Sequence, residues 1–180
     1  EWDETNWVQK GNDIDGDSTL GGFGWAVSMA DKNTITIGAP LYDPNNSNGI
    51  EEGHVRVYKW DGNSWEQKGE GIDGNVFGGD FGWAISMPDS NTFSAGAPFG
   101  LGSPGGYVST FYWNGTKWNQ RGNQITGDSS WHSSGYSVSM PNSDYVSIGS
   151  VDFASWIDFA GHVRVFSTCG GNLDTAISKV

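Results

Sequence analysis

The chain repeats one sequence pattern three times, and this repetition constrains its fold more than any other feature. The first copy, residues 11–40, reads GNDIDGDSTLGGFGWAVSMADKNTITIGAP. Residues 69–98 and 122–151 align with it without a gap, at offsets of 58 and then 53 residues. A second block follows each copy and begins at Gly53, Gly106 and Gly161. Because only the intervening segments vary in length, the pattern indicates one supersecondary unit copied three times, with loops that grow at one edge.

Within one copy, apolar residues alternate with polar ones, which is typical of short strands separated by turns. In the first copy we expect strands over residues 23–29, 34–37, 53–60 and 65–68. Trp60 and Trp65 flank the last turn, where pairing of the two rings across the strands would fix the register, and Trp113 and Trp118 flank the same turn in the second copy. Four short antiparallel strands in a unit of about 50 residues match the size of a propeller blade.

The sequence therefore predicts an all-β, propeller-like fold of three four-stranded antiparallel blades in a single repeat domain, residues 1–180. The blades are expected at about 23–69, 81–122 and 135–166. A β-sandwich is the competing fold, but a sandwich would not require three gapless copies.

Three blades leave two open edges, because closed propellers have about four to eight. Residues 2–10 resemble a fourth strand that precedes the first blade, and the tail 167–180 supplies no aromatic fourth strand to the third. The N-terminal strand can complete blade three of its own chain or of a neighbour, in a closed oligomer or a fibre. The chain can also be a piece of a longer propeller. We expect other copies of the chain as partners, with residues 173–180 as a candidate donor strand or a frayed terminus.

Composition excludes several classes of function. The formal net charge of −12 argues against nucleic acid as a partner, because phosphate binding requires a basic surface. No apolar run approaches the roughly 20 residues that membrane insertion by a helix requires. The 28 glycines and 10 tryptophans instead favour tight turns and aromatic packing.

Two N-glycosylation sequons begin at Asn45, in the longest variable segment, and at Asn114, in an expected hairpin turn. Both fall in loops, which favours an extracellular or cell-surface glycoprotein over a chance occurrence. The single Cys169 gives no internal disulfide and is either a free thiol or an intermolecular bridge.

The repeat resembles the FG-GAP, integrin-type β-propeller repeat, in a Trp-rich variant found in secreted and surface proteins of bacteria and microalgae. The matching segments of the first copy are Phe23-Gly24, Ile37-Gly38-Ala39-Pro40 and Gly53-His54-Val55-Arg56-Val57-Tyr58. The resemblance covers residues 7–166 and implies a propeller fold with a role in extracellular adhesion or scaffolding.

Calcium-binding members of that family carry an Asp-x-Asp-x-Asp-Gly loop between the first and second strands. Here that link is only Ala30-Asp31-Lys32-Asn33, which is too short to wrap an ion that needs about six to eight oxygen ligands. An acidic cluster lies elsewhere, at Asp13, Asp15 and Asp17, and its carboxylates are largely lost from the later copies. We therefore expect no cofactor and explain the cluster by turn chemistry, with calcium as the alternative.

We expect no catalysis. His54 and His162 occupy the same repeat position, which favours a scaffold role, and His132 lies in a Ser-rich link without an evident acid or thiol partner. The sequence holds no Cys/His metal-binding spacing, phosphate-binding loop or nucleophile elbow.

Carbohydrate binding is the alternative function, because tryptophan faces stack on sugar rings. Trp131 and Trp156 are the candidate sugar-binding residues, since neither follows the repeat, although both can also cover the core. Trp25, Trp83 and Tyr136 recur at one position and are expected to pack. The sequence thus favours a non-enzymatic extracellular structural or adhesion protein, either a self-assembling subunit, for example of a filament, or a module of a surface protein.

Overall fold

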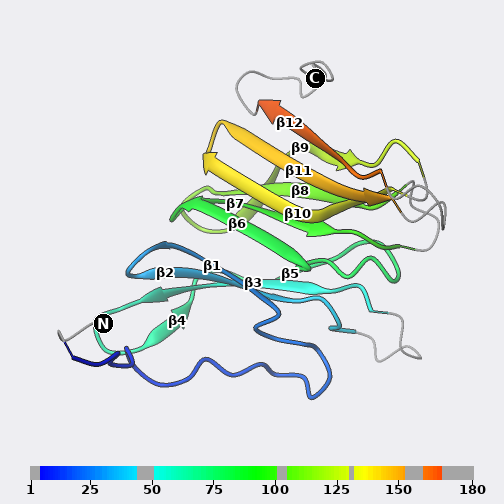
Figure 1. Ribbon diagram of the computed structural model, residues 1–180. Coiled ribbons are helices and arrows are strands. Elements are labelled where there is room, and N and C mark those ends of the chain that lie inside the picture. The colour runs from blue at the N-terminus through cyan, green and yellow to red at the C-terminus, as the bar shows by residue number, and fades with distance from the viewer. Residues whose placement is uncertain (1–4, 44–50, 101–104, 130–131, 153–159, 168–180) are drawn as a thin grey trace.

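The computed structural model describes residues 5–43, 51–100, 105–129, 132–152 and 160–167, and every regular element within these ranges is a β-strand. The strands form three antiparallel sheets that follow one another in chain order and stack face to face (Figure 1). The predicted all-β class is confirmed. None of the three sheets closes on itself within the described ranges. The same ranges contain no helix that is long and apolar enough to cross a membrane.

Each sheet is a meander in which neighbours in sequence are neighbours in space. Sheet 1 has the order β1 (Ala26–Asp31), β2 (Thr34–Ala39), β3 (His54–Trp60) and β4 (Trp65–Gln67), and β5 (Ile72–Asp73) pairs with the start of β3. Sheet 2 has the order β6 (Ala84–Asp89), β7 (Thr92–Ala97), β8 (Tyr107–Trp113) and β9 (Trp118–Thr126). Sheet 3 has the order β10 (His132–Asn142), β11 (Tyr145–Asp152) and β12 (His162–Ser167).

The first strand of the repeat begins later than the sequence predicts. It was expected from Phe23, but β1 begins at Ala26 because Gly24 has a φ of 91° and Trp25 N–H donates to Gly22 O in a turn. The equivalent turn in the second copy is closed by Trp83 N–H and Asp80 O.

The turns use side-chain oxygens at matching places in the repeat. Between the first two strands of each sheet, Asp31, Asp89 and Asn142 each accept the N–H two residues later. In the hairpins that follow, Asp61 and Asn114 accept backbone N–H groups in the same way.

The expected tryptophan pairs flank these later hairpins. Trp60 pairs with Trp65 and Trp113 with Trp118 in the strand register, and their ring centroids lie 5.4 and 5.3 Å apart. The predicted register of both hairpins is therefore confirmed.

The prediction of four strands in each unit is wrong for the third sheet, which has three within the described residues. The sequence after β12 lacks the tryptophan pair that sets the fourth strand in sheets 1 and 2. The expected N-terminal strand over residues 2–10 is also not formed where it is described, since residues 8–10 are irregular and only Trp7 makes a bridge.

The hydrophobic core lies between the sheets. The cluster between sheets 1 and 2 contains Val55, Val57, Phe81, Met87, Phe93, Ala95, Ala97, Tyr107 and Phe111. The cluster between sheets 2 and 3 contains Val108, Ile125, Met140, Val146, Ile148 and Phe166. Because the two core clusters lie between neighbouring sheets, stability depends on stacking, as in repeat proteins generally.

Candidate functional site

The contact between sheets 1 and 2 is repeated between sheets 2 and 3. Met87 N–H donates to Ser28 Oγ at 3.0 Å, and its equivalent Met140 N–H donates to Ser86 Oγ at 2.9 Å. A hydroxyl of the preceding sheet also donates to each methionine sulfur, from Thr36 to Met87 and from Ser94 to Met140. The first strand of each later sheet therefore docks on its predecessor through the same side chains.

Glycine permits the backbones to meet closely in this contact. Gly82 and Gly135 have φ values of 94° and 90° and are buried against the preceding sheet. A Cβ at these positions would lie 2.7 Å from His54 O and 2.5 Å from Tyr107 O, respectively. Gly24, the equivalent residue of sheet 1, is exposed, and a Cβ there would meet nothing within 4 Å among the described atoms. The space that a preceding sheet would fill is therefore open beside Gly24.

An aromatic ladder crosses the three sheets. The ring centroids of Trp25 and Trp83 lie 4.7 Å apart, and those of Trp83 and Tyr136 lie 5.6 Å apart. The expectation that these rings pack is confirmed, since they pack on one another. The two end rings remain partly exposed, Trp25 at 51% and Tyr136 at 37%.

Before each of the first two sheets, a lysine contacts the tryptophan pair of that sheet through its ammonium group and its backbone carbonyl. Lys68 Nζ lies 5.1 Å from the ring centroids of both Trp113 and Trp118, and Trp118 Nε1–H donates to Lys68 O at 2.7 Å. Lys10 Nζ contacts Trp60 and Trp65 in the same way, and Trp65 Nε1–H donates to Lys10 O at 2.9 Å. Burial lowers the pKa of Lys68. Lys68 ends the unit before sheet 2, and Lys10 is the equivalent residue before sheet 1. Lys10 therefore contacts sheet 1 as the last residue of a preceding unit would contact it.

The two outer faces of the stack expose the residues that the inner contacts bury. We call Val163 and Val165 the β12 face; Val163 is 71% exposed and Val165 43%, whereas the equivalent Val55 and Val57 of β3 are 0% and 1% exposed. We call Trp25, Val27 and Met29 the β1 face; Met29 is 54% exposed, whereas the equivalent Met87 is 4% exposed. Both faces thus expose contact residues that no neighbouring sheet covers among the described residues.

The predicted acidic cluster is not gathered into one site. Asp13 accepts a hydrogen bond from Gln9 Nε2, and Asp17 forms an ion pair with Arg56, whose hydrogen bond lowers the pKa of the Asp17 carboxyl. The ligand atoms of Asp13, Asp15 and Asp17 do not converge in the described chain. Calcium binding there stays a prediction, and the Asp17–Arg56 pair argues against it.

Several residues for which the sequence predicts a role lie outside the described residues: Asn45, Trp131, Trp156, Cys169 and the tail 168–180. Asn114 is described and exposed, and its Oδ1 accepts hydrogen bonds from Thr116 N–H and Oγ1–H. Glycosylation at both sequons and sugar binding by the two tryptophans stay predictions.

His54 belongs to a polar network at the start of β3. His54 Nδ1 lies 2.6 Å from Asp73 Oδ1, and Arg56 Nε donates to His54 Nε2 at 2.6 Å while its Nη2 contacts Asp17. Both ring nitrogens of this histidine are therefore engaged by protein groups.

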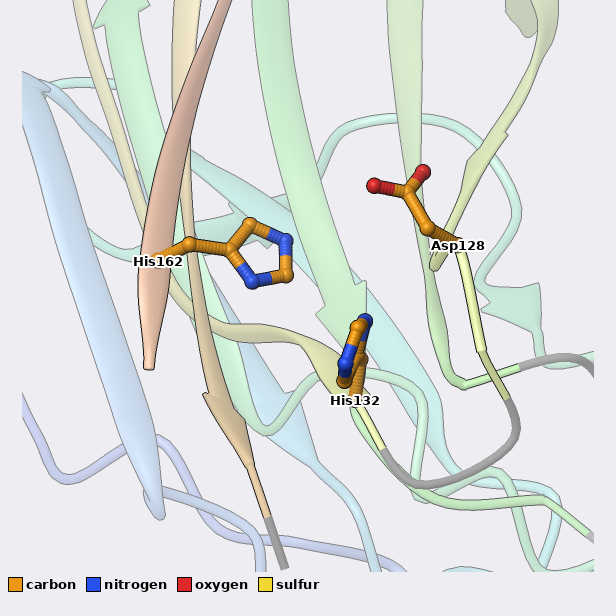
Figure 2. A group of neighbouring side chains, drawn as sticks. All are labelled: Asp128, His132 and His162. Atoms are coloured by element: carbon orange, nitrogen blue, oxygen red, sulfur yellow. The ribbon is translucent and has the colours of Figure 1, made fainter. Parts of the chain in front are cut away.

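Sequence reasoning missed a second polar cluster. Asp128, His132 and His162 bring their ligand atoms within 4.8 Å of one another (Figure 2). The signal was present in the repeat register, because Asp128 and His162 occupy the positions of Asp17 and His54. The expectation that His132 lacks an acidic neighbour is wrong, since the fold brings Asp128 beside it.

Neither a comparison with protein-family models nor a search of the curated proteins finds a match to this chain.

Proposed function

We propose that the chain is a non-enzymatic structural subunit that assembles head to tail with copies of itself. In this assembly the β12 face of one copy covers the β1 face of the next, so that every sheet is a blade of a propeller-like stack. The proposal rests on one observation: each outer face exposes residues whose equivalents in the inner contacts are buried or partly buried.

The two faces fit each other because the chain already contains their contact twice. In the assembly, Val163 and Val165 of one copy would pack on the β1 face of the next, as Val55 and Val57 share a buried cluster with Met87 inside the chain. Tyr136 of the first copy would continue the aromatic ladder onto Trp25 of the second. Gly24 would supply the close backbone approach that Gly82 and Gly135 make inside the chain.

A face-to-face contact of this kind is heterologous, since two different surfaces meet. Such contacts close into a ring when the rotation between copies allows it, and otherwise they extend into a fibre. Exposed valine, methionine and tryptophan side chains favour association, because burying one such side chain contributes about 1.5–3 kcal/mol. The FG-GAP resemblance and the exposed Asn114 sequon support an extracellular, glycosylated setting with a scaffolding or adhesive role.

Sedimentation velocity over a concentration series tests the proposal. The chain of 19.4 kDa is expected to sediment as a multiple of that mass or as a fibre. Val163→Asp places a charge in the proposed contact and should yield the monomer. The matched control is Val8→Asp, because the equivalent positions carry the polar residues Glu66 and Asn119. A wild-type monomer at all accessible concentrations, or equal loss of assembly in both variants, would overturn the proposal.

A further inference from the structure

A polar cluster outside the two proposed contact faces lies where the link between sheets 2 and 3 meets β12. Asp128 follows β9, His132 begins β10 and His162 begins β12. Figure 2 shows the three side chains, from three separate segments, directed toward a common space. We propose that Asp128, His132 and His162 bind one divalent transition-metal ion of the zinc class, a site that is independent of the proposed assembly.

The donor set suits such an ion. Two imidazole nitrogens and one carboxylate oxygen are ligands that Zn²⁺, Cu²⁺ and Ni²⁺ accept, whereas Ca²⁺ and Mg²⁺ prefer oxygen ligands alone. The ligand atoms lie within 4.8 Å of one another, and the His132 and His162 rings meet at an angle of 72° with centroids 4.9 Å apart. With metal–ligand bonds of about 2.0–2.1 Å, tetrahedral ligands lie about 3.3 Å apart. Closing around an ion therefore requires shifts on the order of 1 Å, which side-chain rotation supplies.

The equivalent position in sheet 1 shows what the same residues do as a structural network. There Arg56 Nε donates to His54 Nε2, and Asp73 holds His54 Nδ1. Gly21 stands where sheet 3 has His132, so the network contains a single histidine. In sheet 2 the equivalent residues are Asn75, Gly79 and Tyr107, which do not form a nitrogen-rich site.

In sheet 3 the arginine is arranged differently. Arg164 Nη1 donates to Asp128 Oδ1 at 2.7 Å, and its Nη2 donates to Thr126 O and to Ser134 Oγ. Its Nε, the atom that contacts histidine in sheet 1, is buried without a hydrogen-bond partner among the described groups. The guanidinium therefore holds the carboxylate and the strand rather than the histidine, and the two imidazoles face each other beside the carboxylate.

The Arg164 charge limits the affinity of the site without blocking it. It contacts Oδ1 of Asp128, so Oδ2 is the carboxylate atom available to a cation. The guanidinium repels a divalent ion, while the formal charge of −12 on the whole chain attracts one. A bound ion would join the link before β10 to the start of β12 and would stabilise the folded chain by mass action.

Isothermal titration of the full chain with ZnCl₂, and the visible spectrum of the Co²⁺ form, test the site. Each variant introduces the residue found at the equivalent position of another copy of the repeat. His132→Gly introduces the glycine of positions 21 and 79, and His162→Tyr introduces the tyrosine of position 107. The control is His54→Tyr, which makes the same change in sheet 1. Tryptophan fluorescence verifies that each variant is folded.

The proposal expects one ion per chain, d–d bands of nitrogen-ligated Co²⁺ in the wild type, and a rise in the thermal midpoint with Zn²⁺. Each variant of the cluster should weaken binding about tenfold or more and lose the midpoint rise, while His54→Tyr keeps both. Absence of binding to the folded wild type would overturn the proposal. Equal binding by wild type, His132→Gly and His162→Tyr would also overturn it, because the ion would then lie elsewhere.

Discussion

The substitution Val→Ala at two equivalent positions separates folding from assembly. Val55 of β3 is 0% exposed against sheet 2, whereas Val163 of β12 is 71% exposed on the outer face. Val55→Ala should therefore destabilise the isolated chain. Val163→Ala should leave the isolated chain nearly unchanged and weaken the contact between copies.

The magnitudes follow from the buried area. Truncating valine removes two carbon groups worth about 0.8 kcal/mol each when fully buried, so Val55→Ala costs about 1.6 kcal/mol plus a cavity term. Covering the 71% of Val163 that is exposed gives about 1.1 kcal/mol for the same change, or about sixfold weaker association per contact. Within the monomer, Val163→Ala should shift the free energy of unfolding by less than about 0.5 kcal/mol.

Two measurements are needed, because association itself stabilises the folded chain. Urea unfolding at low concentration, where monomer predominates, gives the stability of each variant, and sedimentation equilibrium gives the association constant. The reasoning is refuted if Val163→Ala destabilises the dilute chain as much as Val55→Ala does, since the outer face would then be covered within one molecule. It is equally refuted if Val163→Ala leaves the association constant unchanged.

Two further predictions concern single residues. Burial and the Glu51 charge raise the pKa of Asp80 to about 6, so the contribution of Asp80 to folding stability should be fully present below pH 4 and be lost as the pH rises through 6. Asp80→Asn should remove about 1 kcal/mol of this loss of stability, after allowance for the partial exposure of the side chain. Asparagine also tolerates the φ of 55° at this position. Equal urea midpoints for the wild type and Asp80→Asn at pH 7 would contradict the prediction. Gly82→Ala should destabilise the monomer by at least about 1 kcal/mol more than Gly24→Ala, because only Gly82 meets the backbone of another sheet. Equal destabilisation, measured by urea unfolding of dilute chains, would contradict that packing difference.

Much of the fold could be predicted from the repeat, because strand alternation, turn residues and paired tryptophans act locally. The hairpins at Asp31 and Asp61 and the Trp60–Trp65 register depend on neighbours in sequence, and all three were predicted. The start of β1 was missed because alternating apolar residues do not reveal the turn at Gly24, which has a positive φ and lies just before the strand. The alignment of three copies indicates which side chains recur, but not how the backbones of successive sheets meet.

The candidate sites were harder to predict. The number of copies predicted open edges. The side chains that form the two faces became clear only when the exposure of equivalent residues was compared, as for Met29 and Met87. The cluster around His132 was missed because its members lie in three segments, and because His132 departs from the repeat, whose other copies have Gly21 and Gly79 at that position. Its proximity to His162 depends on the pairing of β10 and β12 with the two edges of β11, which spacing along the chain does not reveal.

Mixing two singly blocked chains tests the head-to-tail assembly most directly. Val163→Asp blocks the β12 face and Val27→Asp blocks the β1 face, so each variant alone should be a monomer of 19.4 kDa. Mixed in equal amounts, each pair retains one intact β1 face and one intact β12 face, and sedimentation velocity should show a one-to-one heterodimer. Two monomers that stay separate in the mixture, or either variant that self-associates like the wild type, would contradict the proposed contact.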